Sequence, residues 1–230
     1  EGQPGWTLAD SWIYARLQQV VREVERLFDN YQYGEAGRQI YDFLWGEFAD
    51  WYVEIAKLQL DLDGDRAFYT AQTLLQVLDQ TLRLLHPFTP FVTEELWGHL
   101  KLATQEYFPA YRPEGGWEEA LIIARWPEQR HEEPWERGKI ADFELVQEVV
   151  RAIRNLRAEK SVPPSRKIPA TLAGGDATPI LCDQAAAIAA LSNLDPGELQ
   201  IAERLEEKPE GSVALIAGPV EIYLPLAGMV

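Results

Sequence analysis

Six basic side chains gather in one short stretch of an otherwise acidic chain. The 230 residues carry 21 Lys and Arg against 37 Asp and Glu, a formal net charge of −16. Residues 146–170 hold six basic and two acidic side chains, whereas the flanking stretches 117–145 and 171–230 are both acidic. Clustered Lys and Arg are the side chains that contact a phosphate backbone. The six, called the basic window below, are Arg151, Arg154, Arg157, Lys160, Arg166 and Lys167.

The spacing of these cations predicts where each one points. Four of them follow each other at intervals of three on an expected helix, so they wind around it instead of forming a flat stripe. With the apolar face centred near Val149 and Ile153, Arg151 and Arg154 point outward. We expect these two to contact a phosphate backbone.

The other four members of the basic window fall into two pairs. Arg157 and Lys160 turn back toward the bundle side at the C-terminal end of the helix, where cations suit the helix dipole and can pair with carboxylates. For these two, a structural role and phosphate contact stay open as alternatives. Arg166 and Lys167 follow the helix and join the phosphate-contacting candidates.

Other chemistry finds little support. The chain has neither of the glycine-rich phosphate-loop motifs, and Cys182 with three histidines is too few for a zinc cluster. The turn Asp61-Leu62-Asp63-Gly64-Asp65 imitates the opening of a calcium loop, but Arg66 replaces the required Gly and Gln72 the required Glu. We therefore predict no catalytic residue, no metal site and no cofactor in this chain.

The expected helix at 33–61 carries a stripe of four aromatic rings, which can be interpreted in two ways. The four rings step by three and four, and they could stack on bases or form bundle core. We predict core for all four. They are Tyr41, Trp45, Phe48 and Tyr52.

Apolar residues recur at helical spacing through the first hundred residues, which predicts four antiparallel helices with short connections. Thr7 or Asp10 is a candidate cap for the first, and Thr89 with Pro90 for the fourth. The expected helices are 7–29, 33–61, 66–85 and 89–102. Residues 103–136, rich in Pro, Gly and Trp, are expected to form an irregular crossing loop lying against the bundle.

The spacing of the apolar residues changes in the last 65 residues, from a helical pattern to one that includes short strands. After a fifth helix at 139–160, we expect a strand at 168–173, an alanine-rich helix at 177–191 and short strands at 199–202, 213–217 and 220–224. The fold class is therefore mainly α, an antiparallel helical bundle followed by a small α+β appendage. We place the bundle in residues 1–164 and the appendage in residues 165–230.

Location and completeness can also be predicted. No apolar run reaches membrane-spanning length, and no signal peptide or initiator Met is present. A single thiol fits a reducing compartment, so we expect a cytoplasmic protein. We also expect the chain to be part of a longer one.

Three stretches carry a resemblance to a known family. They are YDFLWGEFADWYVE at 41–54, LHPFTPFVTEELW at 85–97 and RNLRAEKSVPPSRK at 154–167. In this order they resemble the C-terminal region of bacterial valyl-tRNA synthetases. The second stretch is shared with the isoleucyl and leucyl enzymes, whereas the first and third favour the valyl type.

The resemblance implies a helical anticodon-binding bundle of the class I synthetase type, with tRNA-Val as partner. It also implies a parent enzyme that joins valine to tRNA using ATP. The family's two catalytic signatures are absent, so we expect this chain to be inactive alone, monomeric, and bound to neither DNA nor membrane. The family's upstream bundle helix and basic coiled-coil arm would lie outside the chain.

Alternatives from other classes remain. The chain could be the anticodon-binding domain of an isoleucyl- or leucyl-type synthetase. It could be a stand-alone module that docks proteins through the Trp-rich loop at 117–135, or a small acidic enzyme.

Overall fold

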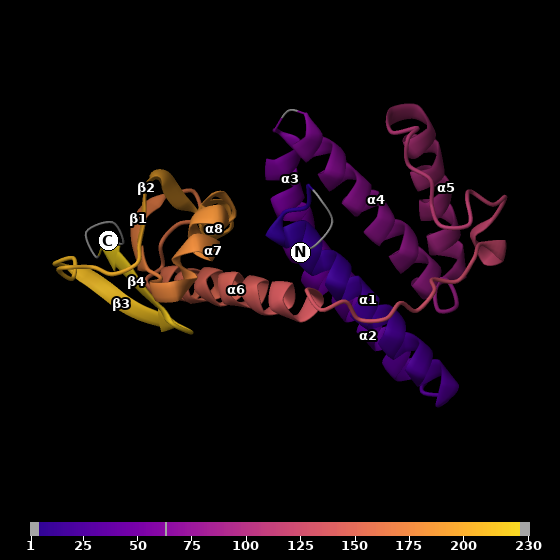
Figure 1. Ribbon diagram of the computed structural model, residues 1–230, viewed down its shortest axis with the longest axis horizontal. Helices are drawn as coiled ribbons and strands as arrows, with labels where there is room; N and C mark the ends of the chain where they lie inside the picture. Colours follow the sequence, from indigo (N-terminus) through magenta and orange to yellow (C-terminus); the bar gives the residue numbers. More distant parts are fainter. Residues whose placement is uncertain (1–4, 63, 226–230) are drawn as a thin grey trace. The chain divides into compact units, whose positions relative to one another are not determined.

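The computed structural model describes residues 5–62 and 64–225 and confirms a mainly helical fold with one small sheet (Figure 1). The chain forms two compact units, Glu1–Ile140 and Ala141–Val230. Among the described residues, no helix is both long and apolar enough to cross a membrane.

The helices of the first unit begin where the local signals predict. Thr7 caps α1 through a capping box, in which its hydroxyl accepts from the Asp10 backbone while Asp10 accepts from the Thr7 backbone. Pro90 occupies the first turn of α5 after Thr89. The helices of this unit are α1 (Leu8–Asp29), α2 (Tyr33–Phe43), α3 (Glu54–Leu60), α4 (Asp65–Leu85) and α5 (Pro90–Tyr107).

The aromatic stripe is only half core, so our prediction is wrong at two of its four positions. Phe48 and Tyr52 are buried, whereas Tyr41 is 59% exposed and Trp45 is 53% exposed. The cause is a π-helical segment, Leu44–Val53, between α2 and α3. Its wider turn separates the buried Phe43 and Phe48 by five positions, so counting back from Phe48 in steps of three and four reaches the wrong face.

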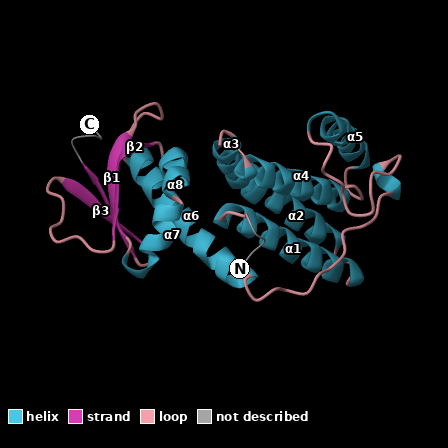
Figure 2. Ribbon diagram, turned by 45° about the horizontal axis from the view of Figure 1, so that its top comes forward, coloured by secondary structure: helices cyan, strands magenta, loops and turns pink. Residues whose placement is uncertain are grey.

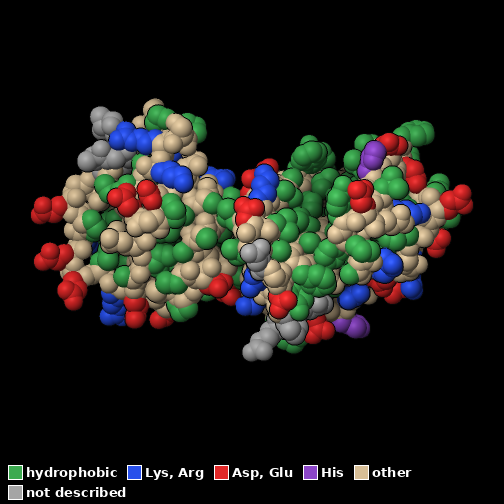
Figure 3. Space-filling view, turned by 90° about the horizontal axis from the view of Figure 1, so that it is seen from above, with side chains coloured by type: hydrophobic (Ala, Val, Ile, Leu, Met, Phe, Trp, Pro, Cys, Tyr) green, Lys and Arg blue, Asp and Glu red, His purple; other side chains and the backbone are tan. Residues whose placement is uncertain are grey.

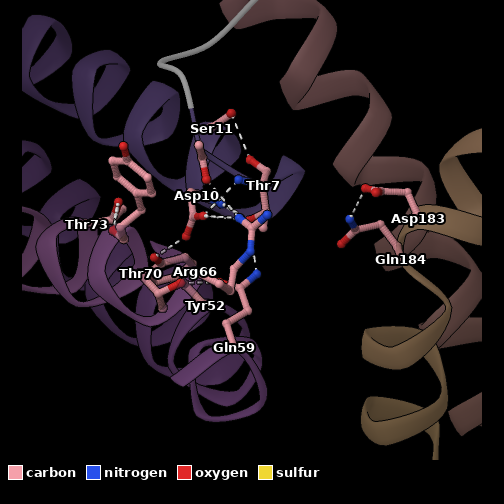
Figure 4. A network of polar contacts seen from close by, with 12 residues as sticks. Thr7, Asp10, Ser11, Tyr52, Gln59, Arg66, Thr70, Thr73, Asp183 and Gln184 are labelled. Carbon is pink, nitrogen blue, oxygen red and sulfur yellow. Dashed lines mark hydrogen bonds and ion pairs between the residues drawn. The ribbon is translucent and has the colours of Figure 1, made fainter. Parts of the chain in front are cut away.

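A polar network joins the N-terminus of α1 to α3 and α4 inside the helical core (Figure 4). The fully buried carboxylate of Asp10 accepts from the Tyr52 hydroxyl at 2.6 Å, and Arg66 lies 4.0 Å away. Gln59 donates to Thr7 and accepts from Thr70. Because each member is satisfied, the network fixes the packing of these helices.

The crossing loop between α5 and α6 (Glu136–Glu159) lies against the helices of the first unit, as predicted. Three half-buried Trp rings hold it: Trp117 on Trp97 at 5.1 Å, Trp126 on Phe28 at 5.6 Å and Trp135 on Trp6 at 6.4 Å between ring centroids. These contacts explain how a long segment with one short 3₁₀ turn, Leu121–Ile123, keeps a defined path.

The second unit is a four-stranded sheet with helices on one face (Figure 2). The strand order is β2-β1-β4-β3, with β1 parallel to β2 and antiparallel to β4, and with β3 and β4 forming the predicted hairpin. Its elements are β1 (Ile168–Ala173), α7 (Thr178–Asp183), α8 (Ala185–Ser192), β2 (Leu194–Ala202), β3 (Ser212–Ala217) and β4 (Val220–Pro225).

One expectation for this part of the chain differs from the structure. The alanine-rich helix is broken at the buried Gln184, which leaves helical geometry between α7 and α8. The two compact units meet within α6, between Ile140 and Ala141. α6 belongs mostly to the second unit, because its side chains approach the β3–β4 turn and donate hydrogen bonds to carbonyls at the C-terminal end of α8 and just after it.

Candidate nucleic-acid interface

The basic window occupies the last three turns of α6, the turn that follows, and the residue before β1. It lies entirely in the second unit. Acidic side chains are scattered over the face of the molecule in Figure 3 and do not gather into one patch.

Local backbone geometry ends α6 inside the basic window. Ser161 adopts a left-handed conformation with φ of 54°. The Val162 amide then donates to the Arg157 carbonyl at 2.9 Å, and the Ser161 amide donates to the Ala158 carbonyl at 3.0 Å. This is a Schellman motif, with the buried Val162 as its apolar contact. It turns the chain sharply toward β1.

Arg157 is buried, and its guanidinium binds backbone carbonyls. Only 5% of its surface is exposed. Nη1 donates to the Asn193 carbonyl at 3.2 Å, while Nη2 donates to the carbonyls of Pro163 at 3.1 Å and Arg166 at 2.7 Å. Burial lowers the pKa of this guanidinium from its usual value. Of the two alternatives for Arg157, the geometry supports the structural one, with carbonyl partners in place of carboxylates.

The outward arginines are exposed, as the helical spacing predicts. Arg151 and Arg154 both lie on the solvent side of α6, opposite the fully buried Val149 and Ile153. Arg154 is also tethered, because its Nε donates to the Leu191 carbonyl at 2.6 Å. The contact orients this side chain along the second unit.

The remaining cations are exposed near the helix end. Lys160 directly follows the last residue of α6, Glu159, and is exposed; its Nζ lies 4.0 Å from the Glu159 carboxylate. Arg166 and Lys167 follow the turn, and both are exposed. The structure thus brings five exposed cations to one helix end and its turn: Arg151, Arg154, Lys160, Arg166 and Lys167.

Sequence reasoning missed a second exposed feature in the first unit. Tyr41 and Trp45 present their rings to solvent with centroids 6.3 Å apart. Only the spacing of five between the buried residues Phe43 and Phe48 could have revealed that these two rings face outward.

The described residues of the structure contain no candidate metal site. Within residues 5–62 and 64–225, no three His, Cys, Asp or Glu side chains come close enough to hold an ion. Asp63, the middle carboxylate of the turn that imitates a calcium loop, lies outside these residues.

The chain is similar in sequence to one protein family and to several known enzymes. The family described as the anticodon-binding domain of tRNA ligase matches residues 10–172. The valine–tRNA ligase of Halalkalibacterium halodurans is 38% identical over 224 residues, covering 97% of this chain and 24% of that enzyme. Those of Enterococcus faecalis and Carboxydothermus hydrogenoformans are 37% and 38% identical over 227 and 228 residues, with the same coverage. The chain spans about a quarter of the length of these relatives, and it belongs to the family of anticodon-binding domains of tRNA ligases.

Proposed function

We propose that the chain is the tRNA-recognition region of a cytoplasmic valine–tRNA ligase. The observation that carries this proposal is the 37–38% identity to valine–tRNA ligases across 97% of the chain, together with the family match. In the parent enzyme, the remaining three quarters would join valine to tRNA-Val using ATP. The present region would contribute binding and no catalytic group or cofactor.

The five exposed cations of the basic window are the proposed phosphate contacts. RNA is recognised largely through its shape and backbone, with splayed bases read where strands are single. Arg151, Arg154, Lys160, Arg166 and Lys167 offer a compact set of charges for the backbone. Arg157 is left out of this set, because its guanidinium is buried on three carbonyls.

A salt-dependent titration of the chain with a tRNA-Val transcript tests the proposal. We expect Lys167→Glu to weaken binding and to reduce the slope of log K against log salt by about 0.7–0.9 for each phosphate that the variant no longer neutralises. Lys208→Glu is the matched control, since Lys208 is in the same unit, is 76% exposed and undergoes the same change of charge. Equal affinities and slopes for the wild type and Lys167→Glu would remove the assignment of the basic window. Failure of the wild-type chain to bind the transcript at low salt would remove the proposal itself.

A further inference from the structure

Arg157 contacts the turn between α6 and β1 through both its main chain and its side chain. Its carbonyl accepts from the Val162 amide at 2.9 Å, and its Nη2 donates to the carbonyls of Pro163 at 3.1 Å and Arg166 at 2.7 Å. Nη1 donates to the carbonyl of Asn193, directly after α8, at 3.2 Å. One buried guanidinium therefore joins the turn to the end of α8.

The turn itself contains no regular structure. Residues 160–167 are neither helix nor strand, and β1 begins at Ile168. Within the turn, the Arg166 amide donates to the Pro163 carbonyl at 3.0 Å. This bond is local, whereas the Arg157 side chain ties the same two residues to the preceding helix and to a segment far along the chain. Removing the guanidinium would therefore free backbone between α6 and β1.

The contacts of Arg157 depend on the shape of its side chain as well as on its charge. A guanidinium presents five N–H donors in a rigid planar fork, and two of its nitrogens reach carbonyls from two segments here. A lysine ammonium carries the same charge on a single nitrogen, so it cannot reproduce all three bonds. The charge and the fork can thus be separated by experiment.

Two of the proposed phosphate contacts, Arg166 and Lys167, lie on this turn, and both are exposed. Binding of RNA must immobilise their side chains and the backbone that carries them, and this ordering costs free energy. A turn that is already fixed in the free protein avoids the backbone part of that cost. Arg151, by contrast, lies within α6, six positions before Arg157, where the helix holds its backbone.

We propose that Arg157 is a positioning residue for RNA binding: without contacting RNA, its guanidinium holds the turn so that Arg166 and Lys167 meet the phosphate backbone together. The proposal rests on the RNA-binding function proposed above. It assigns a role in binding to a residue whose burial removes it from the set of phosphate contacts. RNA affinity then depends on the three-carbonyl geometry of Arg157 and not on its charge alone.

The variant Arg157→Lys separates the geometry from the charge. We expect it to bind a tRNA-Val transcript about tenfold more weakly than the wild-type chain, because the turn must now be ordered on binding. The slope of log K against log salt should fall by about 0.7–0.9 for each phosphate contact that the turn no longer makes. Fluorescence anisotropy measures both, at a temperature at which circular dichroism shows the variant fully folded. Unchanged affinity and slope in the folded variant would overturn the proposal.

A double-mutant cycle tests whether the effect runs through the turn. Lys167→Glu should weaken binding by a smaller factor in the Arg157→Lys background than in the wild type, because the contact of Lys167 is already impaired there. Arg151→Glu is the control, since its position in α6 does not depend on the turn, and it should change the affinity by the same factor in both backgrounds. Equal effects of Lys167→Glu in the two backgrounds would also overturn the proposal.

Pro164→Gly gives a test that does not depend on the folding of Arg157→Lys. Pro164 is exposed within the same turn, and glycine there increases backbone freedom without changing a charge. We expect weaker binding of the transcript and a smaller effect of Lys167→Glu in this background as well. Unchanged binding by Pro164→Gly would exclude a contribution from the ordered turn and overturn the proposal, even if Arg157→Lys does not fold.

Failure of this inference can be told apart from failure of the proposed function. If Lys167→Glu weakens transcript binding while Arg157→Lys and Pro164→Gly leave it unchanged, the basic window keeps its proposed role and Arg157 is a structural residue only. If the wild-type chain does not bind the transcript at low salt, the proposed function falls, and this inference falls with it.

Discussion

Nη2 of Arg157 donates a hydrogen bond of 2.7 Å to the backbone carbonyl of Arg166, so one member of the basic window holds the backbone of another. The same nitrogen binds the Pro163 carbonyl, and Nη1 binds the Asn193 carbonyl. The buried guanidinium thereby fixes the turn on which Arg166 and Lys167 are presented.

Replacing Arg157 should therefore destabilise the protein. Arg157→Met removes a charged donor from three buried carbonyls, and we expect a loss of about 2–3 kcal/mol in the free energy of unfolding. Urea denaturation measures this loss. Arg137→Met serves as the control, because the Arg137 side chain is 82% exposed and should change the free energy by less than about 0.5 kcal/mol. Similar values for the two variants would contradict the structural role of Arg157.

The buried pair of Arg83 and Asp79 gives a second prediction. The two side chains are 4% and 2% exposed, and Arg83 also donates to the carbonyls of Glu114 and Arg125 in the crossing loop. Arg83→Met leaves the carboxylate of Asp79 buried without its cation, which should cost about 3–5 kcal/mol in urea denaturation. The double variant Arg83→Met/Asp79→Leu should recover part of that loss. No recovery would mean that the loop contacts, and not the charge pair, dominate the effect.

The aromatic stripe gives a third prediction. Trp45→Ser changes an exposed ring and should leave the free energy of unfolding within about 0.5 kcal/mol of the wild type. Phe48→Ala, three positions further on, removes a buried ring and should cost about 3–5 kcal/mol. Thermal or urea unfolding of both variants tests whether the π-helical segment exposes Trp45 and buries Phe48. A large loss for Trp45→Ser would place that ring in the core.

A surface carboxylate gives a prediction on pH dependence. Hydrogen bonds from Arg38 and then Gln39 lower the pKa of Glu35 from 4.5 to about 2. Because the pKa is lowered in the folded state, the stabilisation is present above pH 4.5 and is lost as the pH falls from 4.5 to about 2. Carbon-13 NMR titration of the Glu35 carboxyl should show the lowered pKa, and Arg38→Met should move it back toward 4.5. High salt should weaken the shift, because both side chains are partly exposed.

Much of the fold could be predicted from short-range signals. Caps and prolines set helix starts through contacts within one turn. Of the two candidate caps for α1, Thr7 and Asp10, the structure has Thr7, and the predicted helix start at Thr89 and Pro90 is confirmed. The strand at 168–173 and the β3–β4 hairpin were likewise visible as local pattern. The three family stretches carried the anticodon-binding assignment, which the family match confirms.

Only the tertiary structure decided which side chains face solvent and which are used internally. The sequence pattern places Arg157 and Arg166 in one basic stretch, but helix spacing cannot show that α8 ends where the Asn193 carbonyl meets Arg157. It also cannot show that Gln80 and Tyr111, 31 positions apart, line one cavity. Sequence patterns report neighbours along a helix or strand, whereas burial and partner choice depend on groups that folding brings together from distant positions. The sequence thus determined the elements and the family, and the packing determined which cations and polar groups are exposed and which are buried.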